Sequence, residues 1–516
     1  MKAVNVLLAL AVSLALALLV LEGGLRLLGM GPTKTINRFD PELGWVKAPG
    51  VTVERKSSEF DVTFQVNALG LRDDEMASPA KPAGTTRVVM LGDSFVLGYT
   101  VDRQDLFVDQ LEHWWKSEGR PVDVINAGTE GYATDQEVLW LETRGKEFQP
   151  DVVLLFPYEN DLYLNAKTRY DRYPKPRFNP NGEAERIVLQ DPGPPPFLDR
   201  CAIGKLLGAF THRIETFEPV AGKKLPLEWV AYFEKDPTPM PEVKERTRGA
   251  LASLKRQCSE LGAKLLVVPI PNKACVEPAA KKRIERQIGI DGGWSTDHPV
   301  DLFMGLCQEL GIPAADPRPA LRAEVATAPE RHLYYQKDWH LNPEGNGALA
   351  RFVHAEVDRR ELLPAATAPS AQVEVPAHHV ATASFGWAKV FALLWAFLSI
   401  AWILTYRGDP AWQAPLKVFA MLALIFTIAL GGGWVLRTLP SNVASAVAVT
   451  FVLVVLGFIL WKLGRRVGTI AELFACFVGR GHWYLIPLVV VLLSVGSLLV
   501  VAASSPLVAP FIYTLF

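Results

Sequence analysis

The sequence predicts an α/β fold in the central part of the chain, with apolar segments at both ends. Three observations lead to this prediction. Short apolar runs typical of buried parallel strands alternate with longer stretches whose apolar residues recur at helical spacing. Several of the strand-like runs end in small or polar residues, at the position where open α/β sheets carry their ligand sites. Of the 516 residues 50% are hydrophobic, and the apolar excess lies at the two ends.

The alternation defines an α/β body that we place at residues 85–362. Parallel strands need crossover connections, so the helices between them should cover both faces of one sheet. The predicted strands lie near residues 87–92, 122–127, 152–156 and 264–269, and the predicted helices near 104–118, 133–146, 241–261, 299–310 and 344–357.

A serine follows the first predicted strand, which runs into a Gly-Asp-Ser turn ahead of the first predicted helix. This turn places Ser94 at the carboxyl end of the strand, where a serine can act as a nucleophile. Such a serine requires a base, a group that orients the base, and donors for an oxyanion.

The required partners occur further along the chain. Asp338 and His340 lie directly before the last predicted helix and supply an orienting carboxylate and a base. Donors for an oxyanion can come from the ends of two other strands. Gly131 closes the loop after residues 122–127, and a glycine lets its backbone N–H approach a ligand closely. Asn160 follows the strand at 152–156.

These four segments resemble the conserved blocks of the SGNH hydrolases, also called GDSL esterases and lipases. The matching segments are Gly92-Asp93-Ser94-Phe95, Asn126-Ala127-Gly128-Thr129-Glu130-Gly131, Glu159-Asn160-Asp161 and Asp338-Trp339-His340. The resemblance implies an SGNH-hydrolase-like parallel sheet with flanking helices, with Ser94 as nucleophile, His340 as general base and Asp338 orienting the imidazole. It also implies an oxyanion hole made of the Ser94 N–H, the Gly131 N–H and the Asn160 side chain.

Two blocks depart from the usual family pattern. The third usually begins Gly-x-Asn-Asp and here has Tyr158 and Glu159 before Asn160. The last is Asp-x-His, where Asp-x-x-His is commoner. The shorter spacing is similar to that of the polysaccharide O-acetyltransferase branch, typified by alginate acetylation proteins, although in those the Asp-His pair precedes the serine.

The N-terminal region divides into an anchor and an extension. Within residues 1–29, an uncharged apolar run from Val4 to Leu21 approaches the ~20 residues that span a bilayer. It predicts an uncleaved transmembrane anchor, with a cleaved signal peptide as the alternative. Residues 30–84 form an extension with a strand near 64–67. Its Arg72 is expected to form a structural ion pair with Asp73 or Asp74, or to pair with an anionic group near the site.

The C-terminal region predicts a membrane domain. A linker rich in Ala, Pro and Thr covers residues 363–385, and residues 386–516 contain four long uncharged apolar stretches, at 387–406, 416–435, 443–461 and 484–503. Basic residues fall mostly on one side of these spans, which indicates a multi-pass protein of the cytoplasmic (inner) membrane whose α/β body faces the periplasm or exterior. The closing segment Pro506 to Phe516 resembles small membrane proteins encoded with polysaccharide-export systems, which implies envelope assembly partners.

An insertion at residues 162–240 interrupts the α/β alternation and is rich in proline and aromatic residues. Because it follows Asn160, we predict that it covers the site and shapes a substrate groove. Tyr163 and Trp229 can stack on sugar rings or fill a small accessory core.

Composition argues against several classes of function. The net charge is −1 with no basic block, so nucleic acid is not an expected partner. No histidine has metal-ligand spacing and no glycine-rich stretch matches a phosphate-binding motif, so neither a metal nor a cofactor is expected. The four cysteines of the body permit disulfides or serve as buried apolar residues; they are Cys201, Cys258, Cys275 and Cys307.

The residues and the resemblance together predict an extracytoplasmic serine acyl esterase or O-acyltransferase that acts on an acylated envelope glycan or a similar ester. Hydrolysis and transfer share one acyl-enzyme, and the sequence does not separate them. Two other functions stay open. One is a non-catalytic glycan-binding or scaffold component of an envelope polysaccharide assembly, and the other is a channel or exporter formed by the membrane region.

Overall fold

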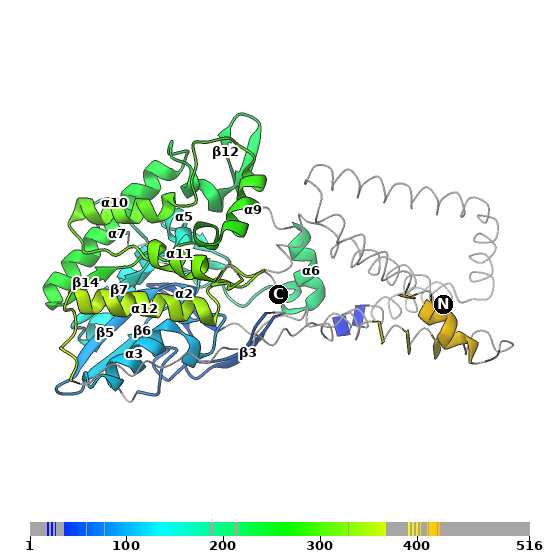
Figure 1. Cartoon of the computed structure of the whole chain (residues 1–516), viewed down its shortest axis with the longest axis horizontal. Helices are drawn as coiled ribbons and strands as arrows, with labels where there is room; N and C mark the ends of the chain where they lie inside the picture. The colour runs from blue at the N-terminus through cyan, green and yellow to red at the C-terminus, as the bar shows by residue number, and fades with distance from the viewer. Residues whose placement is uncertain are drawn as a thin grey trace, which may run out of the picture. The chain divides into compact units, whose positions relative to one another are not determined.

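The computed structural model describes residues 36–367, except 58, 77, 186–188, 212–214 and 329, and scattered positions at 18–26 and 391–423. It separates into two compact units, and the one with residues 33–197 and 210–382 holds the α/β body (Figure 1). The predicted anchor and membrane spans lie almost entirely outside the described residues. No helix among those that are described combines the length and the apolar character needed to cross a membrane.

The centre of the body is a four-stranded parallel sheet with the strand order β14-β7-β5-β6. Its strands are β5 (Thr86–Gly92), β6 (Val122–Asn126), β7 (Val152–Phe156) and β14 (Lys264–Val267). All five residues of β7 are buried, as expected for a strand that is covered on both faces. The four predicted strands are therefore confirmed, and β14 ends two residues earlier than predicted.

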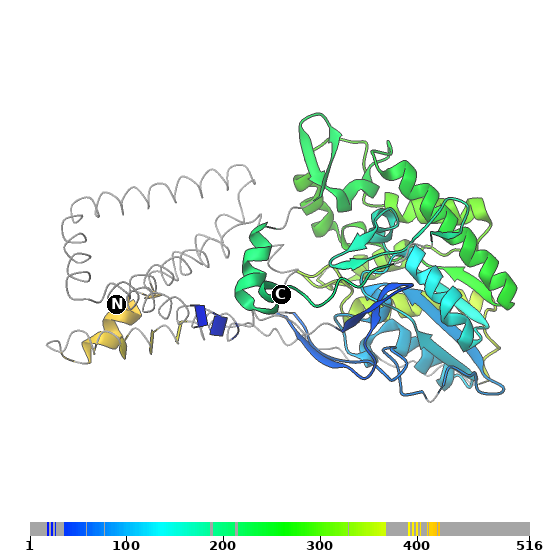
Figure 2. The same ribbon diagram turned by 180° about the vertical axis from the view of Figure 1, so that it is seen from behind.

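Helices cover the two faces of this sheet (Figures 1 and 2). Side chains alternate along β5, so Val88 and Met90 join one hydrophobic core while Val89 and Leu91 join the other. The first core includes α3 (Phe107–Ser117) and α12 (Pro343–Arg359), and the second includes α4 (Thr134–Thr143), α7 (Met240–Leu261) and α10 (His298–Leu310). The five predicted helices are confirmed. Short 3-10 turns, η1 (Arg103–Asp105) and η2 (Gly145–Phe148), replace the predicted start of α3 and end of α4.

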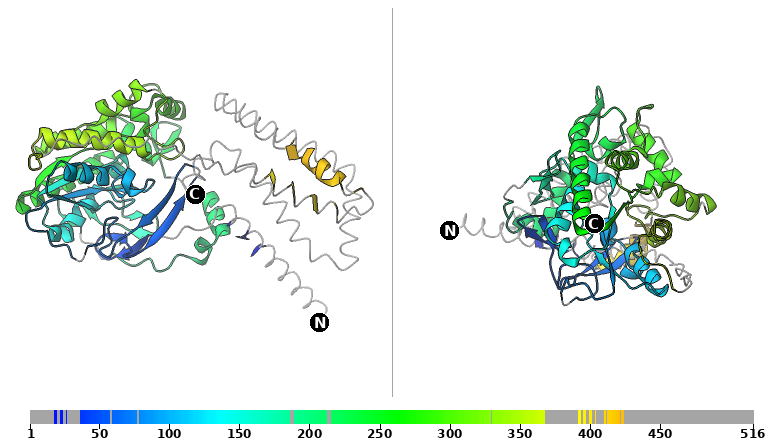
Figure 3. Two further views of the ribbon diagram at one scale, coloured as in Figure 1. Left: turned by 60° about the horizontal axis from the view of Figure 1, so that its bottom comes forward. Right: turned by 90° about the vertical axis from the view of Figure 1, so that its left-hand side faces the viewer.

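The N-terminal extension forms two antiparallel hairpins, which Figure 3 shows in dark blue beside the body. The first pairs β1 (Asn37–Asp40) with β2 (Gly44–Lys47), and the second pairs β3 (Thr52–Lys56) with β4 (Asp61–Gln65). The strand predicted near 64–67 therefore begins earlier. Phe64 of β4 and Val66, which follows this strand, are buried in a small core that includes Leu97 of the body.

The insertion contains short hairpins and contributes to an accessory core that it shares with later residues such as Ile284 and Phe303. Its strands and turns are β8 (Arg169–Tyr170), β9 (Tyr173–Pro174), β10 (Arg177–Phe178), β11 (Ala184–Glu185), η3 (Phe197–Arg200), α6 (Ala202–Thr211), β12 (Thr216–Val220), β13 (Lys223–Pro226) and η4 (Leu227–Tyr232). Tyr163 and Trp229 pack against a cluster that includes Phe217 and Tyr232. Of the two predicted roles for these aromatic residues, the structure therefore shows packing in the accessory core.

Three further helices lie between β14 and α12 in the amino-acid sequence. They are α8 (Lys273–Val276), α9 (Pro278–Ile288) and α11 (Arg318–Thr327). Cys258, Cys275 and Cys307 are buried and form no disulfide within the described residues. The predicted linker begins in contact with the body, since Leu363 is buried and the Thr367 N–H donates to the Glu118 carbonyl at 3.0 Å.

Candidate active site

Ser94 begins α2 (Ser94–Leu97) directly after β5, at the carboxyl edge of the sheet. The Asp93 side chain accepts a hydrogen bond from the Phe95 N–H at 2.9 Å and so caps this short helix. Gly92 allows the tight turn, because a Cβ there would lie 2.2 Å from a methyl carbon of Val96. The local sequence therefore places the serine hydroxyl at the end of the central strand.

The loop before α12 brings His340 to this serine. The imidazole Nε2 lies 2.7 Å from Ser94 Oγ, and Nδ1 lies 2.6 Å from Asp338 Oδ1. The same carboxylate oxygen accepts the backbone N–H of His340 at 2.9 Å. An antiparallel bridge between Tyr334 and Leu341 closes the loop at its base. The short Asp-x-His spacing thus folds the carboxylate back onto both the backbone and the ring of His340.

The electrostatics of this loop define the tautomer of the imidazole. Burial raises the pKa of Asp338, but the adjacent His340 and its hydrogen bonds outweigh this effect and bring the pKa to about 2. Asp338 is therefore ionised at neutral pH and accepts a hydrogen bond from the Nδ1–H of His340. Nε2 is then the acceptor for the Ser94 hydroxyl. The rings of Phe95 and Tyr99 flank the imidazole, with centroid distances of 4.7 and 6.0 Å.

Gly131 and Asn160 follow β6 and β7, so they also lie at the carboxyl edge of the sheet. Gly131 has a φ of +71°, and a Cβ at this position would lie 2.3 Å from the ring of Tyr170, so both conformation and space favour glycine. Asn160 Nδ2 donates to Asp93 Oδ2 at 3.2 Å. Within the described part of the chain, Asn160 Oδ1 and the backbone N–H groups of Ser94 and Gly131 bind no protein group.

Tyr170 is the point at which the insertion reaches this edge. Its ring stacks on Trp45 of the extension at a centroid distance of 5.4 Å, with an interplanar angle of 23°. The side chain is 37% exposed, although it lies against Gly131. The insertion therefore borders the site through one hairpin, while five of its aromatic residues pack in the accessory core: Tyr163, Phe217, Trp229, Tyr232 and Phe233.

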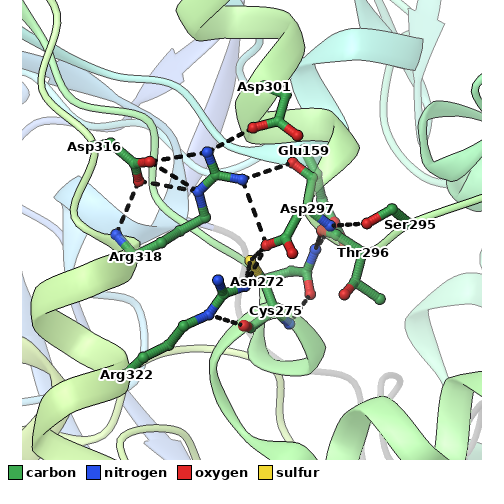
Figure 4. Close-up of polar contacts among 10 residues, drawn as sticks. All are labelled: Glu159, Asn272, Cys275, Ser295, Thr296, Asp297, Asp301, Asp316, Arg318 and Arg322. Carbon is green, nitrogen blue, oxygen red and sulfur yellow. Dashed lines mark hydrogen bonds and ion pairs between the residues drawn. The ribbon is translucent and has the colours of Figure 1, made fainter.

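The role of Glu159 was not predicted from the sequence. Its position was noted only because the third block has Tyr158 and Glu159 before Asn160 where the family usually has Gly-x. Its carboxylate accepts hydrogen bonds from the Tyr232 hydroxyl at 3.0 Å and from Asn272 Nδ2 at 2.6 Å. Asn272 also donates to the Thr296 carbonyl, and Figure 4 shows Glu159, Asn272 and Thr296 beside the ion pairs of Asp297 with Arg318 and Arg322. Burial raises the pKa of Glu159 to about 8. This network holds the residue next to Asn160.

Arg72 departs from both roles expected for it. Its buried guanidinium donates to the carbonyl oxygens of the turn after α2: Leu97 at 3.0 Å, Val101 at 2.7 Å, and Gly98. Asp73 and Asp74 pair with Arg103 instead. The ion-pair prediction was wrong because the carbonyl groups at a helix end attract a cation that the local sequence assigned to neighbouring carboxylates. Arg72 thus supports the helix that carries Ser94.

Lys47 supports the loop that leads to Gly131. Its buried ammonium donates to Thr129 Oγ1 at 2.7 Å and to the Gly128 carbonyl. Burial lowers its pKa to about 8, against the attraction of Glu130. Among the residues that the structure describes, no group of three His, Cys, Asp or Glu side chains is arranged to hold a metal ion.

Comparison with known families finds two matches. A model described as "SGNH hydrolase-like domain, acetyltransferase AlgX" matches residues 231–392, a range that contains Asp338 and His340 but not Ser94. A family of unknown function (DUF5989) matches residues 467–516, outside the described part. The curated proteins contain no significant match.

Solved structures resemble about half of the chain at low sequence identity. An acetyl xylan esterase, AlAXEase, is 14% identical with a TM-score of 0.31, and the match covers 52% of this chain and 99% of the esterase. The esterase EstA from Pseudoalteromonas sp. is 10% identical, with a TM-score of 0.29 and coverages of 54% and 98%. A GDSL-like lipase from Bacteroides thetaiotaomicron is 13% identical, with a TM-score of 0.27 and coverages of 53% and 89%. Residues 231–392 are therefore similar to an SGNH hydrolase-like domain whose family model is described by an acetyltransferase.

Proposed function

We propose that Ser94, His340 and Asp338 form a catalytic triad that transfers acyl groups, as an ester hydrolase or an O-acyltransferase. The observation that carries this proposal is the 2.7 Å contact between Ser94 Oγ and His340 Nε2, with Asp338 on the other ring nitrogen. A serine hydroxyl is a weak nucleophile unless a positioned base removes its proton. This arrangement supplies that base in the tautomer that accepts the proton.

In the reaction, Ser94 Oγ attacks the carbonyl carbon of an ester while its proton passes to His340 Nε2. The negative charge that develops on the carbonyl oxygen is stabilised by the Ser94 N–H, the Gly131 N–H and Asn160 Nδ2. The imidazolium then gives its proton to the departing alcohol, which leaves an acyl-serine. Water or a second hydroxyl, deprotonated by His340, attacks this intermediate and releases Ser94.

The proposed substrate is an acylated glycan of the cell envelope, or a similar ester, on the outer side of the cytoplasmic membrane. Two observations support this part of the proposal. The family model that matches residues 231–392 is named for an acetyltransferase. The apolar segments at both ends of the chain and the distribution of basic residues favour a body that faces outward. Partners in an envelope polysaccharide assembly are part of the same proposal.

A fluorophosphonate probe tests the nucleophile, because it reacts covalently with activated serines. Wild-type full-length protein should be labelled and Ser94→Ala should not. Ser259→Ala is the matched control, since the Ser259 hydroxyl lies at the surface and donates to the Lys255 carbonyl. Absence of labelling in both wild type and Ser94→Ala would favour the non-catalytic scaffold instead.

A second experiment separates hydrolysis from transfer. The protein is incubated with a chromogenic acetyl ester, with and without an oligosaccharide acceptor, and the products are weighed by mass spectrometry. An esterase releases acetate at the same rate in both mixtures. An acyltransferase moves the acetyl group from the enzyme to a hydroxyl of the oligosaccharide, which raises the oligosaccharide mass by about 42 Da for each group transferred.

A further inference from the structure

In the loop that carries Asp338 and His340, Tyr335 is buried and Trp339 packs against the accessory core, but residues 336–338 between them contribute no buried apolar side chain. Gln336 and Lys337 are exposed, and Asp338 and His340 are half-buried. Loops of this kind are usually more mobile than the elements they connect. Its backbone must nevertheless hold the imidazole within hydrogen-bonding distance of Ser94, so contacts from outside the loop are needed to fix it.

The N-terminal extension supplies one such contact. Glu59 lies in the turn between β3 and β4, where the Ser57 hydroxyl accepts the N–H groups of Glu59 and Phe60. The Glu59 carboxylate accepts three successive backbone N–H groups of the loop: Gln336 at 2.7 Å, Lys337 at 2.8 Å and Asp338 at 3.0 Å. Hydrogen bonds from N–H groups to an ionised acceptor are stronger than those to a neutral one.

The opposite side of the same loop is held by a cation. Lys273, the first residue of α8, is buried, and its ammonium donates to the Tyr335 carbonyl at 2.5 Å and to the Gln336 carbonyl at 3.1 Å. The ring of Phe60 packs on Tyr335, with a centroid distance of 5.5 Å. An anion therefore binds the N–H groups of the loop while a cation binds its carbonyl groups.

From this arrangement we infer that Glu59 and Lys273 are positioning residues, which clamp residues 335–338 so that His340 reaches Ser94. The inference rests on the proposed function, since it assigns these residues to the same catalytic site. Within the described residues neither side chain hydrogen-bonds to a triad side chain, so both act through the backbone of the loop. Glu59 has the more direct role, because it binds the N–H of Asp338 itself.

Glu59→Gln is the sharpest test. The variant keeps the size of the side chain, but an NH₂ group replaces one carboxylate oxygen. This group cannot accept the hydrogen bonds that the backbone N–H groups donate to that oxygen in wild type. Displacing a catalytic group by about 1 Å commonly lowers the rate about a hundredfold. For the full-length protein we expect kcat for a chromogenic acetyl ester to fall at least about tenfold, with KM within about twofold of wild type.

Three further variants complete the experiment. Glu54→Gln is the matched control, an exposed glutamate on the same hairpin, and should leave kcat unchanged. Glu59→Asp keeps two acceptor oxygens and should recover part of the lost rate. Lys273→Met removes the ammonium and should lower kcat in the same direction as Glu59→Gln.

Hydrogen exchange distinguishes positioning from general stability. In Glu59→Gln, the amides of residues 336–338 should exchange faster while those of α7 keep their wild-type protection. A wild-type kcat in Glu59→Gln, or faster exchange throughout the body, would overturn the inference. Ser94→Ala serves as the reference: if that variant keeps activity, the proposed function itself fails, whatever the result for Glu59.

Discussion

The triad and the proposed oxyanion donors lie at one edge of the sheet but are held in different ways. Asp338, His340 and Ser94 bind one another through two contacts of 2.6 and 2.7 Å. Gly131 and Asn160 are instead held through neighbouring residues. Lys47 donates to Thr129 in the loop before Gly131, and Asn272 donates to Glu159 next to Asn160. The three residues of the proposed triad thus contact one another without substrate, whereas the proposed donors would act only when negative charge develops on the substrate oxygen. Changes to the triad should therefore have the larger effects.

The largest expected effect comes from Asp338→Asn. An asparagine can donate to His340 Nδ1, which favours the tautomer whose Nε2 carries a proton and cannot accept the one from Ser94. We expect kcat for the chromogenic acetyl ester to fall on the order of 10⁴-fold. Asp291→Asn, at an exposed aspartate, is the control. A loss smaller than about tenfold would show that Asp338 does not orient the imidazole.

Asn160→Ala should have the next largest effect. Removing one oxyanion donor commonly costs about 3–4 kcal/mol of transition-state stabilisation, or about 10²–10³ in kcat. KM should change little, because the donor binds the developing charge more strongly than it binds the substrate. Steady-state kinetics of this variant and of Asn181→Ala, an exposed control, measure the difference. Full activity in Asn160→Ala would remove this residue from the oxyanion hole.

Glu159→Gln tests the buried carboxyl group next to Asn160 through its effect on the free energy of unfolding. Burial raises the pKa of Glu159 to about 8 from its ordinary value of 4.5. The folded state therefore holds this proton more tightly than the unfolded chain, and the stabilisation is complete below about pH 4.5 and lost as the pH rises through about 8. Glutamine imitates the protonated form, so the variant should be more stable than wild type at pH 9, by up to about 5 kcal/mol.

Denaturant titrations of both proteins at pH 5 and pH 9 give the free energies of unfolding for this comparison. The control is Glu54→Gln, whose exposed side chain should produce no such pH-dependent gain. Equal losses of stability between pH 5 and pH 9 in wild type and Glu159→Gln would contradict the assignment.

The smallest expected effect concerns acid stability of the triad. The pKa of Asp338 is lowered to about 2, so the ionised form stabilises the folded state above about pH 4, and this contribution is lost as the pH falls through about 2. Between those values wild type should lose about 2 kcal/mol more than Asp338→Asn. Urea denaturation of both proteins at pH 2.5 and pH 5 measures it. Parallel losses would mean that no stabilising contact with His340 is made.

Much of the fold was predictable because its signals are local. The apolar run of β7, for example, identifies a strand buried on both faces without reference to any other segment. Ser94, Asn160 and His340 could be predicted as site residues in the same way, since each lies where a predicted strand ends or a predicted helix begins. Parallel strands end at a common edge, which made their proximity predictable before any distance was known.

The supporting contacts were not predictable in this way. Glu59 binds N–H groups 277 to 279 residues away along the chain, and no pattern around residue 59 marks it as different from other surface glutamates. Arg72 was assigned to the neighbouring aspartates because only neighbours are visible in a sequence. Tyr163 and Trp229 could face a substrate or a core, and only the packing of the insertion decided between them.

The sequence by itself determined the α/β alternation and the residues that we propose for acyl transfer, because periodicity and strand-end chemistry are properties of short segments. Only the tertiary structure decided which distant charges hold those residues in place. A carboxylate such as Glu59 acquires its role when folding brings backbone N–H groups of a remote loop within hydrogen-bonding distance. The spacing of residues along the sequence does not indicate which distant segments meet in this way.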